Sequence, residues 1–349
     1  MTTGPLDGLR IVDMTNVVMG PFATQILGDL GADIIKLEAP VGDTTRKIPP
    51  MRNPNMGCTF LHLNRNKRSL VLDLKQPDHL AAFFRVIETA DALISNIRPQ
   101  AMARLGLTWE KLRVVNPRLV SVALVGFRQN GPYAGRPVYE DLIQGLTAVP
   151  SMLVSAGSET PHYVPVTFND HAVGQSAAIA LLAAIRHRDL TGRGQEVQVP
   201  MFETMVQSTL GDHMGGRTFD PPLGPPGYKR ILTSERRPFA TKDGYVCVII
   251  YTDKHWASFF QLVGKPELMA DPRLADIGAR TTHSAELYPM IAEEMTGRTT
   301  AEWLEALDAA DIPATPLHTL ESLFDDPHLE AVGFFETGDH PTEGRITQM

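Results

Sequence analysis

The sequence predicts an α/β protein with a large domain built on a parallel sheet and a smaller α+β domain after it. Short apolar segments alternate with helical patterns over residues 9–199, and a Gly- and Pro-rich stretch over 215–238 precedes a different pattern. Of the 349 residues, 43 % are hydrophobic, which is enough to fill a sizeable core. Strands that alternate with helices form parallel sheets covered by helices on both faces.

The first strand, helix and strand lie within residues 9–38. An apolar run over 9–14 predicts a strand, helical spacing of apolar residues over 22–30 ends at Gly31, and residues 33–38 predict the next strand. The pattern recurs more loosely farther along the chain. There we expect strands over 69–74, 92–95 and 119–125 and a helix over 77–89.

The most pronounced helix covers residues 171–187. It is rich in Ala and Leu and apolar nearly all round, so we expect it to be buried. It stops at the turn over 191–194, and a strand over 196–199 and an amphipathic helix over 201–210 follow. The smaller domain is predicted to contain a strand over 245–250, a helix from near Asp253, helices over 284–296 and 299–310, and a strand over 314–317.

Composition and charge exclude several classes of protein. The chain has 32 basic and 40 acidic residues, so it lacks the general positive field that nucleic-acid binding needs. Cys58 and Cys247 lie far apart and match no zinc or redox spacing, so we interpret both as buried thiols and expect no metal site. The sequence shows no apolar run of about 18 residues and no signal-peptide pattern, which predicts a cytoplasmic protein without a membrane segment.

Several common nucleotide and hydrolase motifs are absent. The turn after the first strand reads Thr-Asn-Val-Val-Met-Gly-Pro over 15–21, where a dinucleotide site would need G-x-G-x-x-G. The sequence contains no Walker motif, no H-E-x-x-H and no G-x-S-x-G. Phosphoryl transfer, zinc proteolysis and serine hydrolysis are therefore disfavoured.

A basic segment over 62–75 is a candidate anion site. It contains four basic residues against one acid, in a chain that is acidic as a whole. Cations at a strand edge can neutralise the phosphates of a nucleotide-like ligand. The alternative is a solvated basic loop. The residues concerned are Arg65, Lys67, Arg68 and Lys75, with Asp73 as the acid.

Asp170 is a candidate nucleophile. It directly precedes the predicted buried helix, where a carboxylate can cap the first N–H groups, and this structural role is the alternative to a catalytic one. The same position keeps a carboxylate ionised and oriented. Neighbouring amides could then stabilise the charge that develops when it attacks a carbonyl.

The order of several sequence blocks is more specific than any single motif. The first region contains Leu-Arg-Ile-Val-Asp-Met-Thr at 9–15 and Thr-Gly-Arg-Gly-Gln at 191–195, and the second contains Thr-Thr-Ala-Glu-Trp-Leu at 299–304. Together with further blocks they span essentially the whole chain and resemble the family III CoA-transferases. That family includes formyl-CoA transferase, carnitine CoA-transferase and the α-methylacyl-CoA racemases. The further blocks lie at 20–38, 64–75, 90–99, 104–107, 116–119, 126–133, 243–245, 312–316 and 326–327.

The resemblance implies a domain organisation. It places a large Rossmann-like domain over 1–214, a linker over 215–238 and a small α+β domain over 239–325. Residues 326–349 are interpreted as the start of a segment that returns to the large domain, because family members usually continue beyond this point. The resemblance also implies a homodimer of two interlocked chains.

The resemblance further implies which residues form the site. Asp170 falls on the catalytic aspartate of the family. CoA or acyl-CoA would be a substrate, a carboxylic acid the second substrate, and no cofactor or metal would be bound permanently. CoA would contact Val18, Met19, Leu72, Asp73, Leu74, Lys75, Asn96, Ile97, Arg98, Arg104, Pro137, Val138, Tyr139 and Glu140.

The implied chemistry exchanges one activated acyl group for another. Asp170 attacks the acyl-CoA thioester, which gives a mixed anhydride and CoA thiolate. The thiolate then attacks the anhydride, the donor acid leaves, and an aspartyl-CoA thioester remains. An acceptor carboxylate reverses these steps, so neither ATP nor a metal is needed.

Departures from the family pattern leave two alternatives open. Val18 stands where formyl-CoA transferases carry Gln, no glycine run occurs between 213 and 240, and Ala39 replaces an often basic residue, so oxalate and formate are unsupported as substrates. Racemases use a His base where this chain has Glu140, which is either a base or an exposed acid at a helix start. His171 either orients a substrate carboxylate or is structural. An acyl-CoA racemase or isomerase, and a non-catalytic CoA-binding protein, remain the alternatives to a CoA-transferase.

Overall fold

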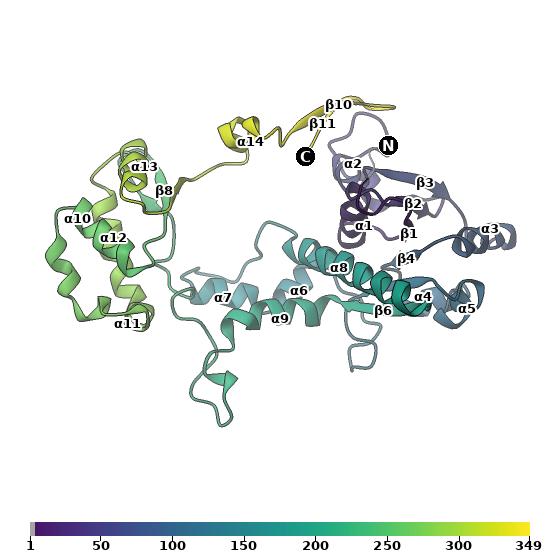
Figure 1. Ribbon diagram of the computed structural model, residues 1–349, viewed down its shortest axis with the longest axis horizontal. Coiled ribbons are helices and arrows are strands. Elements are labelled where there is room, and N and C mark those ends of the chain that lie inside the picture. The colour runs from purple at the N-terminus through teal and green to yellow at the C-terminus, as the bar shows by residue number, and fades with distance from the viewer. Residues whose placement is uncertain (1–3) are drawn as a thin grey trace. The chain divides into compact units, whose positions relative to one another are not determined.

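The computed structural model describes residues 4–349, which form two compact units (Figure 1). The first unit contains the described residues up to Thr147 together with Tyr163–Thr209 and Phe335–Met349. The second contains Ala148–His162 and Leu210–Phe334. The domain bounds given above stay a prediction.

A six-stranded parallel sheet forms the centre of the first unit, which confirms the predicted fold class. Its order is β3-β2-β1-β4-β5-β6, so the direction in which strands are added reverses between β1 and β4. Open sheets bind ligands at such a switch point, beyond the carboxyl ends of the strands. The strands are β1 (Arg10–Met14), β2 (Asp33–Glu38), β3 (Lys67–Val71), β4 (Ala92–Ser95), β5 (Val120–Val125) and β6 (Gln195–Pro200).

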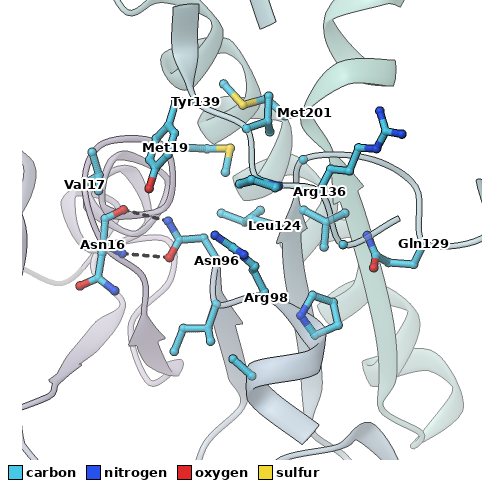
Figure 2. A pocket seen from close by; sticks show the side chains of 18 of the residues that line it. Asn16, Val17, Met19, Asn96, Arg98, Leu124, Gln129, Arg136, Tyr139 and Met201 are labelled. Carbon is cyan, nitrogen blue, oxygen red and sulfur yellow. Dashed lines mark hydrogen bonds between the residues drawn. The ribbon is translucent and has the colours of Figure 1, made fainter. Parts of the chain in front are cut away.

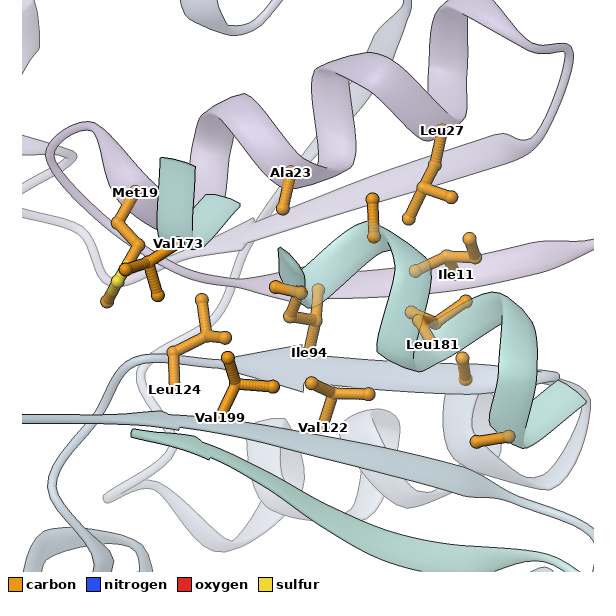
Figure 3. Packing of buried hydrophobic residues seen from close by; sticks show 14 of the residues in the cluster. Ile11, Met19, Ala23, Leu27, Ile94, Val122, Leu124, Val173, Leu181 and Val199 are labelled. Atoms are coloured by element: carbon orange, nitrogen blue, oxygen red, sulfur yellow. The ribbon is translucent and has the colours of Figure 1, made fainter. Parts of the chain in front are cut away.

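Helices cover both faces of this sheet. On one face, α1 (Met19–Asp29) and α8 (Phe168–Thr191) pack side chains such as Leu27 and Leu181 against apolar residues of the strands (Figure 3). On the other face, α3 (Pro77–Glu88) and α5 (Trp109–Val115) contribute to a second core. The alternation along β1, with Ile11 in the first core and Val12 in the second, is what a strand buried on both sides requires.

Shorter elements complete the first unit. They include α2 (Cys58–Leu63), α4 (Pro99–Arg104), α6 (Glu140–Leu146) and a 3-10 helix over Thr44–Lys47, while α9 (Met201–His213) follows β6. Near the C-terminus, β10 (Glu336–His340) and β11 (Gly344–Gln348) form an antiparallel hairpin, drawn in yellow in Figure 1. The amide N–H of Asn53 donates to the Glu343 carboxylate at 3.1 Å, and the Arg52 guanidinium donates to the Glu343 carbonyl. The hairpin is thereby attached to the first unit.

The second unit is a small α+β structure. Its antiparallel sheet has the order β7-β8-β9, with β7 (Phe239–Ala240), β8 (Tyr245–Val248) and β9 (Ala314–Pro316). Trp256, Phe259 and Trp303 are buried in its core. Its helices are α7 (Val149–Ser155), α10 (Asp253–Leu262), α11 (Ile277–Thr282), α12 (Ser284–Met295), α13 (Thr300–Ala309) and α14 (Pro327–Ala331), with 3-10 segments at Gly215–Thr218, Pro266–Ala270, Pro272–Leu274 and Ser322–Asp325.

Among the predicted elements that differ in detail from the structure are three of the first unit. Helix α1 begins at Met19 rather than at residue 22, because Gly20 and Pro21 are accommodated in its first turn. Strand β3 begins at Lys67, two residues earlier than predicted. Helix α8 begins at Phe168 with Thr167 at the N-cap, so Asp170 lies inside the first turn and is not the cap. The same helix is not buried all round, since Ile179 on it is 68 % exposed.

Two buried ion pairs lie under the turn between β1 and α1. Lys36 pairs with Asp43 at 3.1 Å and Lys67 pairs with Asp13 at 3.0 Å, and none of the four side chains is more than 2 % exposed. The Thr15 and Thr24 hydroxyls also donate to Asp13. Burial would raise the pKa of Asp13, but the two ammonium groups and these hydroxyls outweigh it and lower that pKa. Burial lowers the pKa of Lys67 to about 8, an effect that Asp13 partly offsets.

These ion pairs also bind the backbone of the turn. The Lys36 ammonium donates to the Thr15 carbonyl at 2.9 Å, and the Asp43 carboxylate accepts from the Val17 N–H at 3.3 Å. Val17 has a φ of 72°, a left-handed conformation that a β-branched residue rarely adopts. The surrounding hydrogen bonds therefore hold the turn in a conformation that Val17 alone would not favour.

We expect Lys36→Met to destabilise the protein by roughly 3–5 kcal/mol, because it leaves Asp43 as a buried charge without its ion-pair partner. The measurement is the midpoint of urea unfolding. The matched control is Lys254→Met, which breaks an ion pair between exposed side chains, Lys254 and Asp311, and should change the midpoint little. Equal shifts in the two variants would contradict a structural role for the buried pair.

Candidate active site

A cavity of about 460 Å³ lies in the first unit at the carboxyl ends of β1, β4 and β5. Asn16 to Met19 follow β1, Asn96 to Arg98 follow β4, and Gly126 follows β5; all contribute to its wall. The cavity is thus at the switch point of the sheet. This is where the fold leaves strand ends uncovered and where ligands of open α/β sheets bind.

The cavity brings together most of the residues predicted for the site. Asp170 from the first turn of α8 faces the same space as residues from four other segments of the chain. The predicted residues in the wall are Val18, Met19, Asn96, Ile97, Arg98, Arg104, Pro137, Val138, Tyr139 and Asp170.

The predicted residues after β3 do not line this cavity. Leu72 and Leu74 pack into or against the second core, and Asp73 accepts a hydrogen bond from the Lys75 N–H at 3.1 Å. They lie at the same edge of the sheet, but β2 separates β3 from β1. A ligand would have to extend along this edge to contact Leu72, Asp73, Leu74 and Lys75 as well as the cavity.

Three of the four basic side chains in the segment over 62–75 form ion pairs. Arg65 pairs with Asp29 at 2.6 Å, Arg68 pairs with Asp33 at 2.6 Å, and Lys67 is buried against Asp13. The sequence alone did not indicate these pairs, because the partner carboxylates come from earlier parts of the chain. Of the four cations, Lys75 is the one that forms no ion pair with a described residue.

Three other arginines line the cavity. Arg136 stacks over the Tyr133 ring at 4.5 Å, which fixes its guanidinium. Arg98 and Arg104 form no ion pair with any residue in the described range 4–349. Asp170 is the one carboxylate among the described residues of the wall, so the cavity carries a positive charge overall. This charge suits a ligand with several negative groups.

Two asparagines connect the strands at the switch point. The Asn16 N–H donates to the Asn96 side-chain oxygen at 3.0 Å, and the Asn96 amide donates to the Asn16 carbonyl at 2.8 Å. Figure 2 shows this pair of hydrogen bonds beside Arg98. The pair holds the β1–α1 turn to the end of β4, so the cavity wall is formed before any ligand arrives.

Glu140 caps α8 and is not an exposed acid, as one interpretation of the sequence had it. It is 8 % exposed at the start of α6, and its carboxylate accepts from the Asp170 N–H at 2.9 Å and from the Asn169 side chain at 2.8 Å. The Gln144 amide donates to it at 3.0 Å. The first amides of α8 are therefore occupied. The expectation that they stabilise charge developing at Asp170 is wrong.

The Asp170 carboxyl group has a raised pKa. Burial and the nearby Glu140 charge raise its pKa to about 7. No hydrogen bond from the described residues reaches its carboxyl group, which faces the cavity. Because the folded state favours the neutral acid, Asp170 stabilises the fold below about pH 4 relative to higher pH, and this contribution is lost as the pH rises toward 7.

His171 makes structural contacts within α8 and with α1. Its ring nitrogen Nδ1 contacts the Thr167 carbonyl at 2.7 Å, and its ring packs edge-on against Phe22 with centroids 4.6 Å apart. It does not line the cavity.

The sequence did not identify several residues of the wall, among them Asn16, Gln129, Arg136 and Met201. Asn16 could have been found, because it is a polar residue in the turn that follows a buried strand. Gln129 and Arg136 lie in an irregular segment after β5, and Met201 begins a helix; nothing in their local sequence indicates that they face a ligand.

Comparison with known proteins matches the chain to a single family and to its members. The sequence profile of CoA-transferase family III matches residues 6–349. The chain is 34 % identical over 335 residues to the probable fatty acyl-CoA transferase Rv3272 of Mycobacterium tuberculosis, covering 93 % of this chain and 85 % of the relative. It is 32 % identical over 350 residues to the succinyl-CoA–L-malate CoA-transferase beta subunit of Chloroflexus aurantiacus, covering 95 % and 82 %.

Solved structures agree. The orthorhombic crystal form of the M. tuberculosis protein matches with a TM-score of 0.82 and 30 % identity, over 99 % of this chain and 92 % of that one. A CAIB/BAIF family protein from Brucella suis matches with a TM-score of 0.80 and 29 % identity, over 96 % and 89 %. Within residues 4–349, no helix is long and apolar enough to cross a membrane, and no group of three His, Cys, Asp or Glu side chains is arranged for a metal.

We expect Asp170 to titrate near pH 7 and Glu140→Gln to lower its pKa, because that substitution removes the negative charge beside it. The measurement is a carboxyl carbon-13 NMR titration, with Asp170→Asn used to assign the signal. Asp141→Asn removes a neighbouring exposed charge and serves as the matched control, with little effect expected. An Asp170 pKa near 4, or one that Glu140→Gln leaves unchanged, would contradict this electrostatic description.

Proposed function

The chain belongs to CoA-transferase family III, and from this membership we propose that it moves CoA from an acyl-CoA donor to a carboxylic acid acceptor through an aspartyl-CoA thioester on Asp170. That it is an enzyme of the CoA-transferase type follows from its relatives. The observation that carries the proposed mechanism is the Asp170 carboxyl group. It lies without a side-chain partner in a cavity at the sheet edge whose other charged groups are arginines.

CoA would be held by its phosphates. Arg98 and Arg104 are free to pair with them, and guanidinium groups bind phosphate with two parallel hydrogen bonds. The N-terminus of α1 adds N–H donors, because no side chain caps this helix. Val18 and Met19 at its first turn line the cavity. The thiol end of CoA would then point toward Asp170.

Asp170 would carry the covalent steps. Its ionised carboxylate attacks the thioester carbon; a carbon–oxygen bond forms and the carbon–sulfur bond breaks, which gives a mixed anhydride and CoA thiolate. The thiolate attacks the Asp170 carbonyl carbon of the anhydride, and the donor acid leaves with one oxygen from Asp170. An acceptor carboxylate then attacks the aspartyl thioester, and the same steps in reverse release a new acyl-CoA.

The raised pKa of Asp170 suits this role. A pKa of about 7 leaves a substantial fraction ionised at neutral pH while making the carboxylate more basic than an exposed aspartate. Since the α8 amides are bonded to Glu140, they are not available to stabilise the negative charge on the attacked carbonyl.

The isomerase alternative needs a second acid or base that faces the substrate. Among the described residues of the cavity wall, Asp170 is the one carboxylate and no His is present. Glu140 lies behind Asp170 with its oxygens engaged by Asn169, Asp170 and Gln144. The site therefore favours transfer over α-proton exchange.

Incubation with acyl-CoA, followed by hydroxylamine, should place a hydroxamate on Asp170, because both the anhydride and the thioester react with this nucleophile. The measurement is peptide mass spectrometry after treatment with acyl-CoAs that include succinyl-CoA and a long-chain fatty acyl-CoA. Asp170→Asn should abolish the adduct, and the exposed Asp78→Asn should leave it unchanged. Deuterium exchange at the substrate α-carbon without any adduct would instead support an isomerase. Unimpaired acyl-CoA binding and biological activity in Asp170→Ala would support a non-catalytic CoA-binding protein.

Arg98→Gln and Arg104→Gln should each weaken CoA binding by about 10- to 100-fold, because each removes charge-assisted hydrogen bonds worth roughly 1.5–3 kcal/mol. Calorimetric titration of CoA measures this. Arg113→Gln removes the same charge from an exposed position outside the cavity and should have little effect. Equal losses in all three variants would indicate a general charge effect and contradict the assigned site.

A further inference from the structure

The second unit contains a cavity of its own, of about 370 Å³, that the transferase chemistry does not use. Strand β8 and the residues after it form one wall, α12 forms another, and the segment before β9 closes a third side. Phe239, Ile250 and Ile291 line it and are each at most 6 % exposed, so the cavity reaches the core of this unit. Its floor is apolar and formed by fixed side chains.

Three arginines surround this apolar floor. Arg230, Arg236 and Arg237 line the cavity, and no acidic residue does so within the described part of the chain. Arg230 stacks over the Tyr251 ring at 4.7 Å. Arg237 is partly neutralised by Glu235 at 3.3 Å.

Arg236 has neither an ion pair nor a stacked ring among the described residues. A positive rim over an apolar floor is unexpected in a chain with a net charge of −8. It suits a ligand with one anionic end and one apolar end, because each part of such a ligand would meet its complement.

We propose that this cavity is a second binding site, for a small carboxylate with an apolar chain or ring. The carboxylate would pair with Arg236 and Arg230, and the apolar body would lie on Phe239, Ile250 and Ile291. A phosphate ion would gain nothing from the apolar floor, and a neutral apolar molecule would gain nothing from the arginines. The site shares no lining residue with the Asp170 cavity, and the proposal does not depend on the transferase mechanism.

Cys247 offers a way to block the cavity. It lies in the wall on β8, opposite Thr315 of β9 in the sheet register, and its thiol is half-buried. A Trp at this position would extend into the space that the ligand needs. An Ala would leave the space open, so Cys247→Trp and Cys247→Ala form a matched pair.

Calorimetric titration of the whole protein with hexanoate tests the proposal. We expect saturable binding, a loss of about tenfold or more in affinity for Arg236→Gln, and no binding for Cys247→Trp. Cys247→Ala should bind as the parent does. Arg217→Gln, which removes an exposed charge of the same unit outside the cavity, should also bind normally.

Four results would overturn the proposal. The first is the absence of hexanoate binding, and the second is binding of hexanamide or inorganic phosphate that is as tight as that of hexanoate. The third is loss of hexanoate binding in Arg98→Gln, which would place the acid in the Asp170 cavity. The fourth is normal hexanoate binding in Arg236→Gln. The last result keeps the test valid even where Cys247→Trp fails to fold. Because Asp170→Ala should bind hexanoate normally, failure of this proposal is distinguishable from failure of the transferase mechanism.

Discussion

The turn between β1 and α1 depends on two ion pairs buried beneath it. Lys36 and Asp43 hold the carbonyl of Thr15 and the N–H of Val17, while Asp13 and Lys67 anchor the adjoining strand end. Removing four charges from water costs free energy, which hydrogen bonds to the turn offset here. The ion pairs thereby hold Val17 in a left-handed backbone conformation and place the N-terminus of α1 at the cavity. This turn forms one wall of the cavity at the switch point of the sheet.

A second constraint acts at the first turn of α8. Glu140 occupies the first amides of α8 and so fixes the turn that carries Asp170. The same carboxylate adds to the effect of burial in raising the Asp170 pKa to about 7. One side chain therefore positions the proposed nucleophile and, together with burial, raises its basicity. The consequence is that the first amides of α8 are not free to stabilise charge on the attacked carbonyl.

The strands of the large sheet could be predicted because each is a short apolar run bounded by turn residues, as 9–14 and 33–38 are. Asp170 could be singled out because it stands at the start of a long apolar helix. Its surroundings could not, since Glu140 lies in a separate helix and only the fold brings it against α8. The ion pairs of the basic segment could not be predicted for the same reason. The partner carboxylates, Asp13, Asp29 and Asp33, come from earlier strands and helices. Contacts between distant segments decide which charges remain free for a ligand.

A crystal structure of Asp170→Ala with saturating CoA tests the central claim most directly, because it locates the ligand without turnover. The account predicts CoA at the carboxyl ends of β1, β4 and β5, with its phosphates against Arg98 and Arg104 and its sulfur beside the Cβ of position 170. CoA bound outside this cavity, or bound there with its sulfur at the end remote from position 170, would contradict it.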